Sequence, residues 1–253
     1  MVDNSNMGLE NLKFSDIKLA VVCPMANEHD TAVDFVNAVL EKCRGFKQAT
    51  FFAVLDNKCT DGTFDLLKKL QGQQPQLNVL WAPENRCVVD AYIRGYQQAL
   101  VAGSDWILEI DAGFSHQPSD IPLFLEKMSA GFDCVFGSRF CQGGTITESP
   151  LKRRIISFGG SILTNILLGT RLKDMTSGFE MFTSQALRMI LDKGIKSRGH
   201  FFQTEIKVYC KKLRIIEVPI NYRAPSASVN SAVLKDAVSN LFRLVRLRLV
   251  GKL

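Results

Sequence analysis

The chain has 253 residues, 46% of them hydrophobic, and a formal net charge of +6. This length suits one large α/β domain, and the apolar content excludes a chain that is disordered throughout. The charge is too small to indicate nucleic-acid binding and no stretch interleaves aromatic with basic residues, so we expect no nucleic-acid partner and a mild preference for an anionic substrate or a membrane surface.

The first two-thirds of the chain alternate strands with helices, after a polar tail over residues 1–15 that lacks the apolar core of a signal peptide. Apolar runs predict strands over 17–23, 50–55, 77–81, 106–110 and 133–136. Helical spacing predicts helices over 33–43, 63–70, 88–102 and 120–128. Strands separated by helices of this length predict an α/β fold with a mostly parallel sheet and right-handed crossovers.

Polar residues stand where three of these strands end. Asn27 and Glu28 follow the first strand, Asp56 begins the loop after the second, and Asp111 follows the fourth. Ligands of parallel sheets collect at the carboxyl ends of the strands, so we predict that Glu28, Asp56 and Asp111 line one pocket. The alternative for each residue is an ordinary turn or helix cap.

After about residue 145 the pattern changes. Lys152, Arg153 and Arg154 open an apolar helix to residue 168, followed by a strand over 177–182, a helix over 202–212, a strand over 215–220 and a helix over 232–250. We assign residues 16–230 to a single domain and 231–253 to a basic C-terminal helix. That helix suits an anionic membrane surface, with packing onto the domain or a partner subunit as the alternative. Nothing in the pattern predicts an oligomeric state.

The cysteines and the hydropathy bear on the compartment. Seven cysteines occur without a Cys-x-x-Cys pair, which argues against a zinc site and for a reducing, cytoplasmic setting in which Cys23 and Cys134 are buried thiols. No window approaches the ~18 uninterrupted apolar residues that a transmembrane helix needs. We therefore expect a cytoplasmic protein with peripheral contact at the inner face of a membrane.

Seven short motifs carry a family resemblance between about Leu19 and Arg223. In chain order they are Pro24-Met25-Ala26-Asn27-Glu28, the loop Asp56–Thr63, Asn85 with Ala91, Gly95 and Ala99, the segment Glu109–Pro118, Gly137-Ser138-Arg139-Phe140, Asp174–Phe179 and Gln203-Thr204-Glu205. Together they resemble the family-two glycosyltransferases of the GT-A fold, and most closely the polyprenyl-phosphate (dolichyl-phosphate) sugar synthases. Each motif alone is weak, whereas seven in the family's order are specific.

The resemblance implies an inverting enzyme that moves a hexose from a UDP- or GDP-linked sugar. Donor-binding positions would be Pro24, Asn27, Glu28, Asp56, Asp61 and Asp111, because carboxylates accept hydrogen bonds from base NH groups and ribose hydroxyls. Arg139 would lie near the phosphates, and Lys152, Arg153 and Arg154 on the acceptor and membrane side. Asp111, Arg139 and Glu205 are the catalytic candidates, of which Glu205 would lie near the acceptor.

The acceptor separates the alternatives. A polyprenyl phosphate oxygen is already anionic near neutral pH and needs no strong base, whereas a hydroxyl of a lipid-linked glycan requires a carboxylate to accept its proton. A third hypothesis is a nucleotide-sugar-binding homologue that no longer turns over. A sugar nucleotidyltransferase would want a Gly-rich signature with Arg and Lys after the first strand, and Pro24–Glu28 supplies none.

The metal motif departs from the family. Asp111 matches the first aspartate of Asp-x-Asp, but Gly113 replaces the second, and Ser115 stands where this branch often carries glutamine. We therefore expect Mg²⁺ or Mn²⁺ to bind weakly, held by Asp111, water and the diphosphate, with cationic side chains taking over part of the metal's role as the alternative. We also expect an aspartate at position 113 to lower the metal concentration needed, provided that the loop tolerates a side chain there, since a glycine is typical of positive φ.

Overall fold

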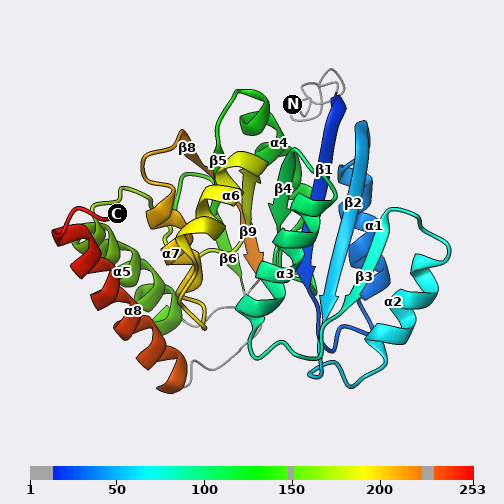
Figure 1. Ribbon diagram of the computed structural model, residues 1–253, viewed down its shortest axis with the longest axis horizontal. Coiled ribbons are helices and arrows are strands. Elements are labelled where there is room, and N and C mark those ends of the chain that lie inside the picture. Colours follow the sequence, from blue (N-terminus) through cyan, green and yellow to red (C-terminus); the bar gives the residue numbers. More distant parts are fainter. Residues whose placement is uncertain (1–13, 148–150, 224–230) are drawn as a thin grey trace.

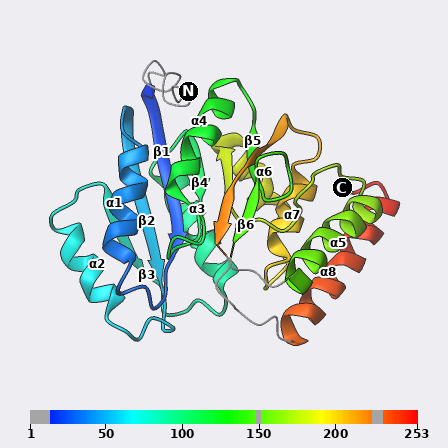
Figure 2. The same ribbon diagram turned by 180° about the vertical axis from the view of Figure 1, so that it is seen from behind.

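The computed structural model describes residues 14–147, 151–223 and 231–253, without the side chains of residues 151–153. It confirms the α/β class: helices cover both faces of a seven-stranded sheet (Figures 1 and 2). In sheet order the strands are β3 (Leu77–Trp81), β2 (Phe46–Leu55), β1 (Phe14–Pro24), β4 (Trp106–Glu109), β7 (Glu180–Thr183), β5 (Cys134–Ser138) and β8 (Ile215–Pro219). The other two, β6 (Thr145–Thr147) and β9 (Asn221–Arg223), pair with each other in parallel.

The main sheet is mixed, because one strand runs against the others. All its pairs are parallel except those of β7, which is antiparallel to both β4 and β5. The helices are α1 (Ala32–Lys42), α2 (Thr63–Gln71), α3 (Val88–Val101), α4 (Ile121–Ser129), α5 (Leu151–Leu168), α6 (Ser184–Lys193), α7 (Phe202–Tyr209) and α8 (Ser231–Leu249), with a 3₁₀ turn at Pro118–Asp120. The predicted mostly parallel sheet is therefore confirmed.

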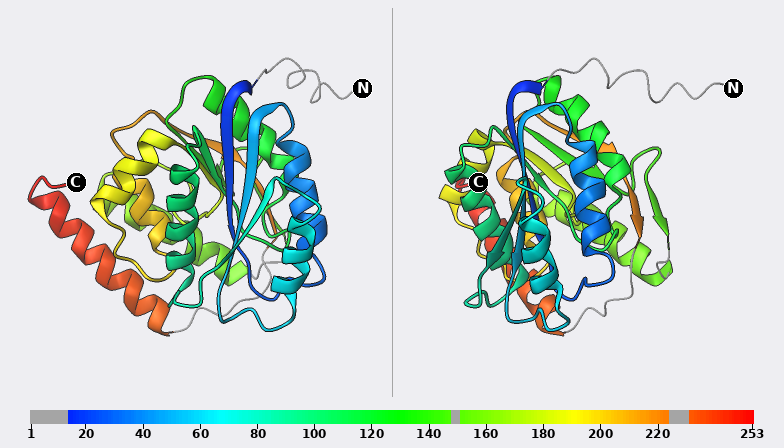
Figure 3. Two further views of the ribbon diagram at one scale, coloured as in Figure 1. Left: turned by 45° about the vertical axis from the view of Figure 1, so that its right-hand side comes forward. Right: turned by 90° about the vertical axis from the view of Figure 1, so that its right-hand side faces the viewer.

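Two hydrophobic cores lie on the two faces of the sheet. Successive side chains of a strand point to opposite faces, so Leu19 and Val21 of β1 enter the core beneath α1, α2 and α4, while Ala20 and Val22 enter the core beneath α3, α6 and α7. Figure 3 shows helices on both sides of the sheet. Burial on both faces explains why β1 is a continuous apolar run rather than an alternating one.

Helix α3 packs unusually close to the sheet. A Cβ on Gly95 would lie 2.3 Å from Cγ1 of Val22 in β1. Glycine at this position therefore sets the distance between α3 and β1, and α3 carries Tyr92 and Tyr96 beneath the strand ends described below.

Several element bounds differ from the predicted ones: β2 begins at Phe46 rather than 50, β7 spans Glu180–Thr183 rather than 177–182, and α7 ends at Tyr209 rather than 212. Strand β1 begins at Phe14, inside the stretch assigned to a polar tail, and residues 1–13 and the predicted boundary at 230 lie outside the described residues. Helix α6 was not predicted. Its signal was present, since the Thr183 hydroxyl accepts a hydrogen bond from the Ala186 N–H at 3.2 Å and Ala186, Leu187 and Ile190 are buried at helical spacing.

Helices α5 and α8 lie side by side at one end of the molecule (Figures 1 and 2). Their outward-facing large apolar residues make up what we call the α5–α8 surface. Its members are Ile155, Ile156, Phe158, Ile162, Leu163 and Ile166 of α5 and Leu234, Val238, Phe242 and Leu249 of α8, exposed by 45–81%. Among the described residues, no helix has both the length and the apolar character needed to cross a bilayer.

Three polar residues of α8, Asp236, Asn240 and Arg243, face the domain, where the sequence left open whether this helix meets a membrane or packs onto the domain. Asp236 accepts hydrogen bonds from the backbone N–H groups of Arg198 and Gly199 at 3.2 and 3.0 Å, and Arg243 is paired with Glu205. Arg248 donates to the carbonyl of Leu167 in α5 at 2.8 Å. These polar contacts and buried Leu244 attach α8 to the domain, while Leu234, Val238, Phe242 and Leu249 stay exposed.

Candidate active site at the strand ends

The three strands that carry the predicted polar residues are neighbours. Strand β1 pairs in parallel with β2 on one side and β4 on the other, so the loops that follow them meet at one edge. We call these loops, residues 25–31, 56–63 and 110–117, the strand-end rim. Pro24 pairs with Val54 where β1 and β2 end. The topology therefore confirms the shared edge on which the predicted pocket depends.

Asn27 joins the first two loops of the rim. Its φ is +59°, a conformation that asparagine adopts more readily than most residues. Its side-chain oxygen accepts a hydrogen bond from the Thr60 N–H at 2.8 Å, and its side-chain amide donates to the Lys58 carbonyl at 3.0 Å. Asn27 thus fixes the geometry of the rim.

The two aspartates of the second loop shape that loop. Asp56 is buried at the end of β2 and accepts a hydrogen bond from the Lys58 N–H at 2.9 Å. Asp61 accepts from the Thr63 N–H at 3.0 Å and from the His29 N–H at 3.0 Å, and the Thr63 hydroxyl bond lowers the pKa of Asp61 to about 2. Asp61 therefore starts α2 and links it to the first loop.

Glu28 lies against the loop that follows β4. Its backbone N–H donates to the Thr63 hydroxyl at 2.9 Å, and its Oε2 accepts from the Thr31 hydroxyl at 3.0 Å. A Cβ on Gly113 would lie only 2.6 Å from the same Oε2. Burial raises the pKa of Glu28, opposed by the Thr31 bond, and the negative charges of Asp61 and Asp111 raise it further. Glu28 and Asp111 are therefore close enough to interact electrostatically.

Asp111 is held from two sides and is partly open to solvent. The Tyr92 hydroxyl donates to its Oδ1, its backbone N–H donates to Nδ1 of His116 at 3.1 Å, and its side chain is 44% exposed. Burial lowers the pKa of His116 to about 4, so the ring is neutral near pH 7 and can accept at Nδ1. The backbone of Asp111 is thus fixed, and its Oδ2 does not accept the hydrogen bond from Tyr92.

A buried polar network supports this loop from below. Glu109, the residue before Ile110, accepts hydrogen bonds from Tyr96 and from the Gln203 amide. Lys207 pairs with Glu180, and both are fully buried. Burial raises the pKa of Glu180 to about 7, against the lowering effect of Lys207. A carboxylate buried as deeply as that of Glu180 requires a cation beside it, because an unpaired buried charge is costly.

Sequence reasoning missed Tyr92, His116 and Lys207 as supports. The sequence does contain a signal for Lys207, which stands between the apolar residues Ile206 and Val208 of α7. A lysine without a partner is rarely tolerated in such an apolar environment. Tyr92 had no such signal, because an aromatic residue on an apolar helix face is typical of a core position. His116 had no specific signal either, and its role is clear only from its bond to the Asp111 N–H.

The guanidinium of Arg139 forms a bidentate ion pair with the carboxylate of Asp174. Its Nε and Nη2 donate to the two oxygens of Asp174 at 2.7 and 2.8 Å, and Nη2 also donates to Thr176 at 2.6 Å. Burial alone would lower the pKa of Arg139, but the bond to Asp174 raises it. The guanidinium lies 5.3 Å from the Tyr222 ring centroid. Its position is therefore fixed before any ligand binds.

Glu205 lies on the opposite side of α7 from Gln203 and Lys207, the two residues that reach the network. Its fully buried carboxylate accepts from the Ser197 hydroxyl at 2.7 Å and from the Tyr209 hydroxyl at 2.7 Å, and it pairs with Arg243 of α8. Burial alone would raise the pKa of Glu205, but the bonds from Ser197 and Tyr209 lower it. These partners give Glu205 a structural role in attaching α8, and the structure does not bring it to the strand-end rim.

The basic cluster begins α5. Arg154 is exposed, and the side chains of Lys152 and Arg153 lie outside the described residues. Arg154 therefore stands at the same end of the molecule as the α5–α8 surface.

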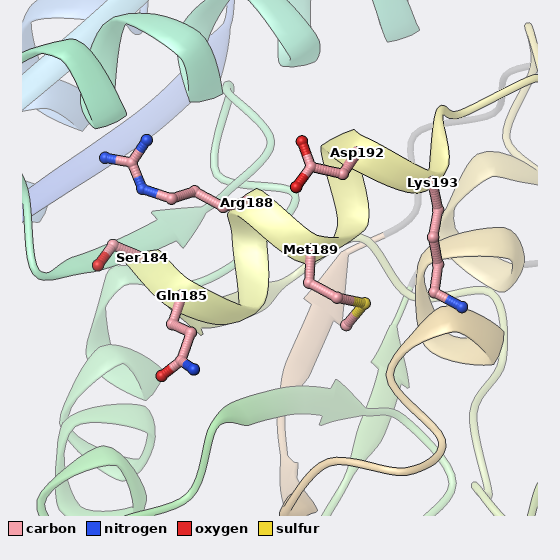
Figure 4. A pocket seen from close by; sticks show the side chains of 6 residues that line it. All are labelled: Ser184, Gln185, Arg188, Met189, Asp192 and Lys193. Atoms are coloured by element: carbon pink, nitrogen blue, oxygen red, sulfur yellow. The ribbon is translucent and has the colours of Figure 1, made fainter.

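One surface depression lies away from the rim, on the outer face of α6 (Figure 4). All its lining side chains come from that single helix: Ser184, Gln185, Arg188, Met189, Asp192 and Lys193. A depression with one wall cannot enclose a nucleotide sugar, and we assign it no role.

The strand-end rim carries the carboxylates of Glu28, Asp56 and Asp111, the oxygen ligand type that hard cations prefer. Among the described residues, no group of three or more His, Cys, Asp and Glu side chains is arranged to hold a metal ion. The expectation for Gly113 is corrected: its φ is +68° and a side chain would collide with Glu28, so an aspartate there would strain the loop rather than complete it.

Residues 20–194 match the family described as glycosyl transferase family 2. The chain is 30% identical to undecaprenyl-phosphate mannosyltransferase of Micrococcus luteus, over 90% of this chain and 93% of that protein. It is 25% identical to polyprenol monophosphomannose synthase of Mycolicibacterium smegmatis, over 92% and 88%. Among solved structures it resembles glucosyl-3-phosphoglycerate synthase of Mycobacterium tuberculosis in complex with Mn²⁺, UDP-glucose and phosphoglyceric acid, with a TM-score of 0.63 at 14% identity over 94% and 84% of the two chains.

Proposed function

The chain belongs to glycosyl transferase family 2, and we propose that it transfers a hexosyl group from a nucleoside-diphosphate sugar to a polyprenyl phosphate. The names of both curated relatives describe mannose joined to a polyprenyl phosphate or polyprenol, and the similarity spans nearly the full length of each. The observation that carries the proposal is the strand-end rim, where Glu28, Asp56 and Asp111 follow three adjacent parallel strands.

The donor would bind across the rim. Asp56 and the loop that Asn27 and Asp61 hold in place would contact the base and ribose, while Asp111 faces the diphosphate. This division is supported by exposure, since Asp111 is 44% exposed beside the loop after β4 and Asp56 is buried at the end of β2. We propose UDP or GDP as the nucleotide, because both suit carboxylate recognition of base NH groups.

The residues present fit a divalent cation. Asp111 has an oxygen that Tyr92 does not use, and carboxylates with diphosphate oxygens are the ligands that Mg²⁺ and Mn²⁺ prefer. When bound, such an ion would neutralise charge on the departing nucleoside diphosphate. The solved neighbour was crystallised with Mn²⁺ and UDP-glucose. Arg139 would orient phosphate oxygens from its fixed position beside Asp174.

The acceptor would react without a protein base. Its phosphate oxygen attacks C1 of the sugar, the bond from C1 to the diphosphate oxygen breaks, and attack from the opposite face inverts the anomeric centre. That oxygen is already anionic near neutral pH, so no side chain needs to take its proton. The saturated hydrogen bonding of Glu205 is consistent with such an acceptor.

A lipid acceptor places the enzyme at a membrane surface, and the α5–α8 surface supports this. Its apolar residues face outward while the polar contacts of α8 face the domain, which is the arrangement of an interfacial helix pair. Exposed Arg154, Lys235 and Arg246 would meet anionic lipid. We propose peripheral attachment at the cytoplasmic face.

Ligand binding and transfer test the proposal. UDP, GDP and their hexoses, each with Mn²⁺, are screened by thermal shift, since a bound ligand raises the apparent stability. The donor that binds is then offered, with a radiolabelled hexose, to polyprenyl phosphate. We expect lipid-linked label, and a loss of about 10²–10³ in rate for Asp111→Asn, the usual cost of removing one group that stabilises developing charge.

Three outcomes would contradict it. If none of the nucleotides and nucleotide sugars produces a thermal shift, the rim is not a donor-binding site. Transfer to a glycan hydroxyl but not to polyprenyl phosphate identifies the other acceptor class. Donor binding without hydrolysis or transfer at any metal concentration identifies a nucleotide-sugar-binding protein. That hypothesis arises because Gly113 replaces the second aspartate of the metal motif.

A further inference from the structure

The loop after β4 offers only one of the carboxylates that an Asp-x-Asp segment would supply. A side chain at position 113 would not enter empty space. Its Cβ would lie 2.6 Å from Oε2 of Glu28 and 3.2 Å from both Cδ and Oε1. The carboxylate of Glu28, which arrives from the loop after β1, therefore fills the space into which a residue 113 side chain would project.

Glu28 is held in that space by its own loop. The Thr31 hydroxyl donates to Oε2 at 3.0 Å, and the Glu28 N–H donates to the Thr63 hydroxyl at 2.9 Å. Across from it, the Tyr92 hydroxyl donates to Oδ1 of Asp111. A carboxylate has about four lone-pair positions, so both groups keep oxygen positions for a further ligand.

We infer that Glu28 supplies the second carboxylate of the divalent-cation site, acting with Asp111 once a nucleoside diphosphate is bound. The inference rests on the proposed function, and it changes the role expected of Glu28 from a base contact to a metal ligand. Two carboxylates from different loops plus diphosphate oxygens form the ligand set that Mg²⁺ accepts. The hydroxyl of Thr31 orients the carboxylate, as an outer partner of a metal ligand does. A glycine at 113 is then required, because any larger residue would displace Glu28.

Titration of Mn²⁺ followed by electron paramagnetic resonance tests the assignment. Wild type, Glu28→Gln and Asp30→Asn are compared at saturating UDP or GDP, whichever binds. Asp30 is the matched control, since it lies in the same loop, carries the same charge and is fully exposed. We expect Glu28→Gln to weaken Mn²⁺ binding at least about tenfold and Asp30→Asn to change it less than about twofold. Nucleotide affinity measured in chelator should be the same in Glu28→Gln as in wild type.

Either of two results would overturn the inference: unchanged Mn²⁺ affinity in Glu28→Gln, or lost nucleotide affinity of that variant in chelator, which would mean a contact to base or ribose. If the variant does not fold, a crystal structure of wild type with Mn²⁺ and the nucleotide decides, by whether a Glu28 oxygen lies within the metal's first shell at about 2.0–2.4 Å. A wild type that binds neither UDP nor GDP overturns the proposed function itself, whereas nucleotide binding with a Glu28-independent metal overturns only this inference.

Discussion

At the strand-end rim, several polar side chains are held by specific hydrogen bonds, whereas the α5–α8 surface presents large apolar side chains to solvent. Asn27, Asp61 and Asp111 are each fixed by at least two contacts, and the network beneath them pairs Glu180 with Lys207. Ile166 and Phe242 are 69% and 70% exposed. The geometry of the rim therefore depends on individual hydrogen bonds and ion pairs. Any contact that the α5–α8 surface makes depends instead on its total exposed apolar area.

The difference teaches where a substitution should affect folding and where it should affect only location. Removing one partner from a buried polar network leaves another group unsatisfied, which reduces stability. Removing one exposed apolar group leaves folding unchanged and weakens only what that area contacts. The predictions below test this division.

The largest effect is expected from Lys207→Met. The change removes the cation from the buried pair with Glu180, and we expect the free energy of unfolding to fall by about 3–5 kcal/mol in urea denaturation. Lys69→Met, on the exposed side of α2, is the control. Replacing Glu180 as well, in Lys207→Met/Glu180→Leu, should restore much of the loss. An equal loss in the single and double variants would mean that packing rather than charge is responsible.

Acid should destabilise the rim through His116. Its pKa is about 4 in the fold against an ordinary value near 6.5, so between these values the unfolded state binds more protons and stability falls as pH falls. The free energy of unfolding in chelator should be about 3 kcal/mol lower at pH 4 than above pH 6.5 from this group. His116→Asn, whose oxygen can still accept from the Asp111 N–H, should flatten this slope, and His200→Asn should not. A slope unchanged in His116→Asn would assign it to other groups.

Phe242→Ser should separate folding from membrane contact. Phe242 is 70% exposed, so the free energy of unfolding should change by less than about 0.5 kcal/mol. Binding to vesicles of anionic lipid should weaken by about 2 kcal/mol, the contribution of one large apolar side chain leaving water. Co-sedimentation measures it. A folded variant that binds vesicles as wild type does would remove the α5–α8 surface as the contact.

The smallest effect is expected from Arg154→Ala. One basic residue near an anionic surface contributes about 1 kcal/mol, so vesicle binding should weaken roughly fivefold at low salt and converge with wild type at high salt. Arg44→Ala, in the exposed turn after α1, is the control. Loss of donor binding in Arg154→Ala would place this residue at the rim instead.

The sequence predicts the first half of the fold and the rim better than the second half. Continuous apolar runs separated by helical segments specify β1 to β5, and the strand-end positions of Glu28, Asp56 and Asp111 follow from them. The antiparallel direction of β7 was not predicted, because it depends on pairing with β4 and β5, which lie far from β7 in the sequence. Helix α6 was not predicted either, although its sequence carries a helix signal. The inward polar face of α8 could not be read either, since helical spacing defines a stripe without saying whether protein or solvent covers it. The close approach of the Glu28 carboxylate to position 113 could not be predicted, because sequence spacing places the two loops at one edge without giving the direction of a side chain.

The position of β7 has a consequence for synthesis of the chain. This strand fills the middle of the sheet between β4 and β5, yet roughly seventy residues separate the end of β4 from its start. At ribosomal rates of about 5–20 residues per second, the edge of β4 that pairs with β7 therefore stays unpaired for several seconds after β4 is synthesised. An open apolar edge of this kind invites pairing with other chains, so the hazard of aggregation in this protein is concentrated in the interval between translation of Glu109 and of Glu180.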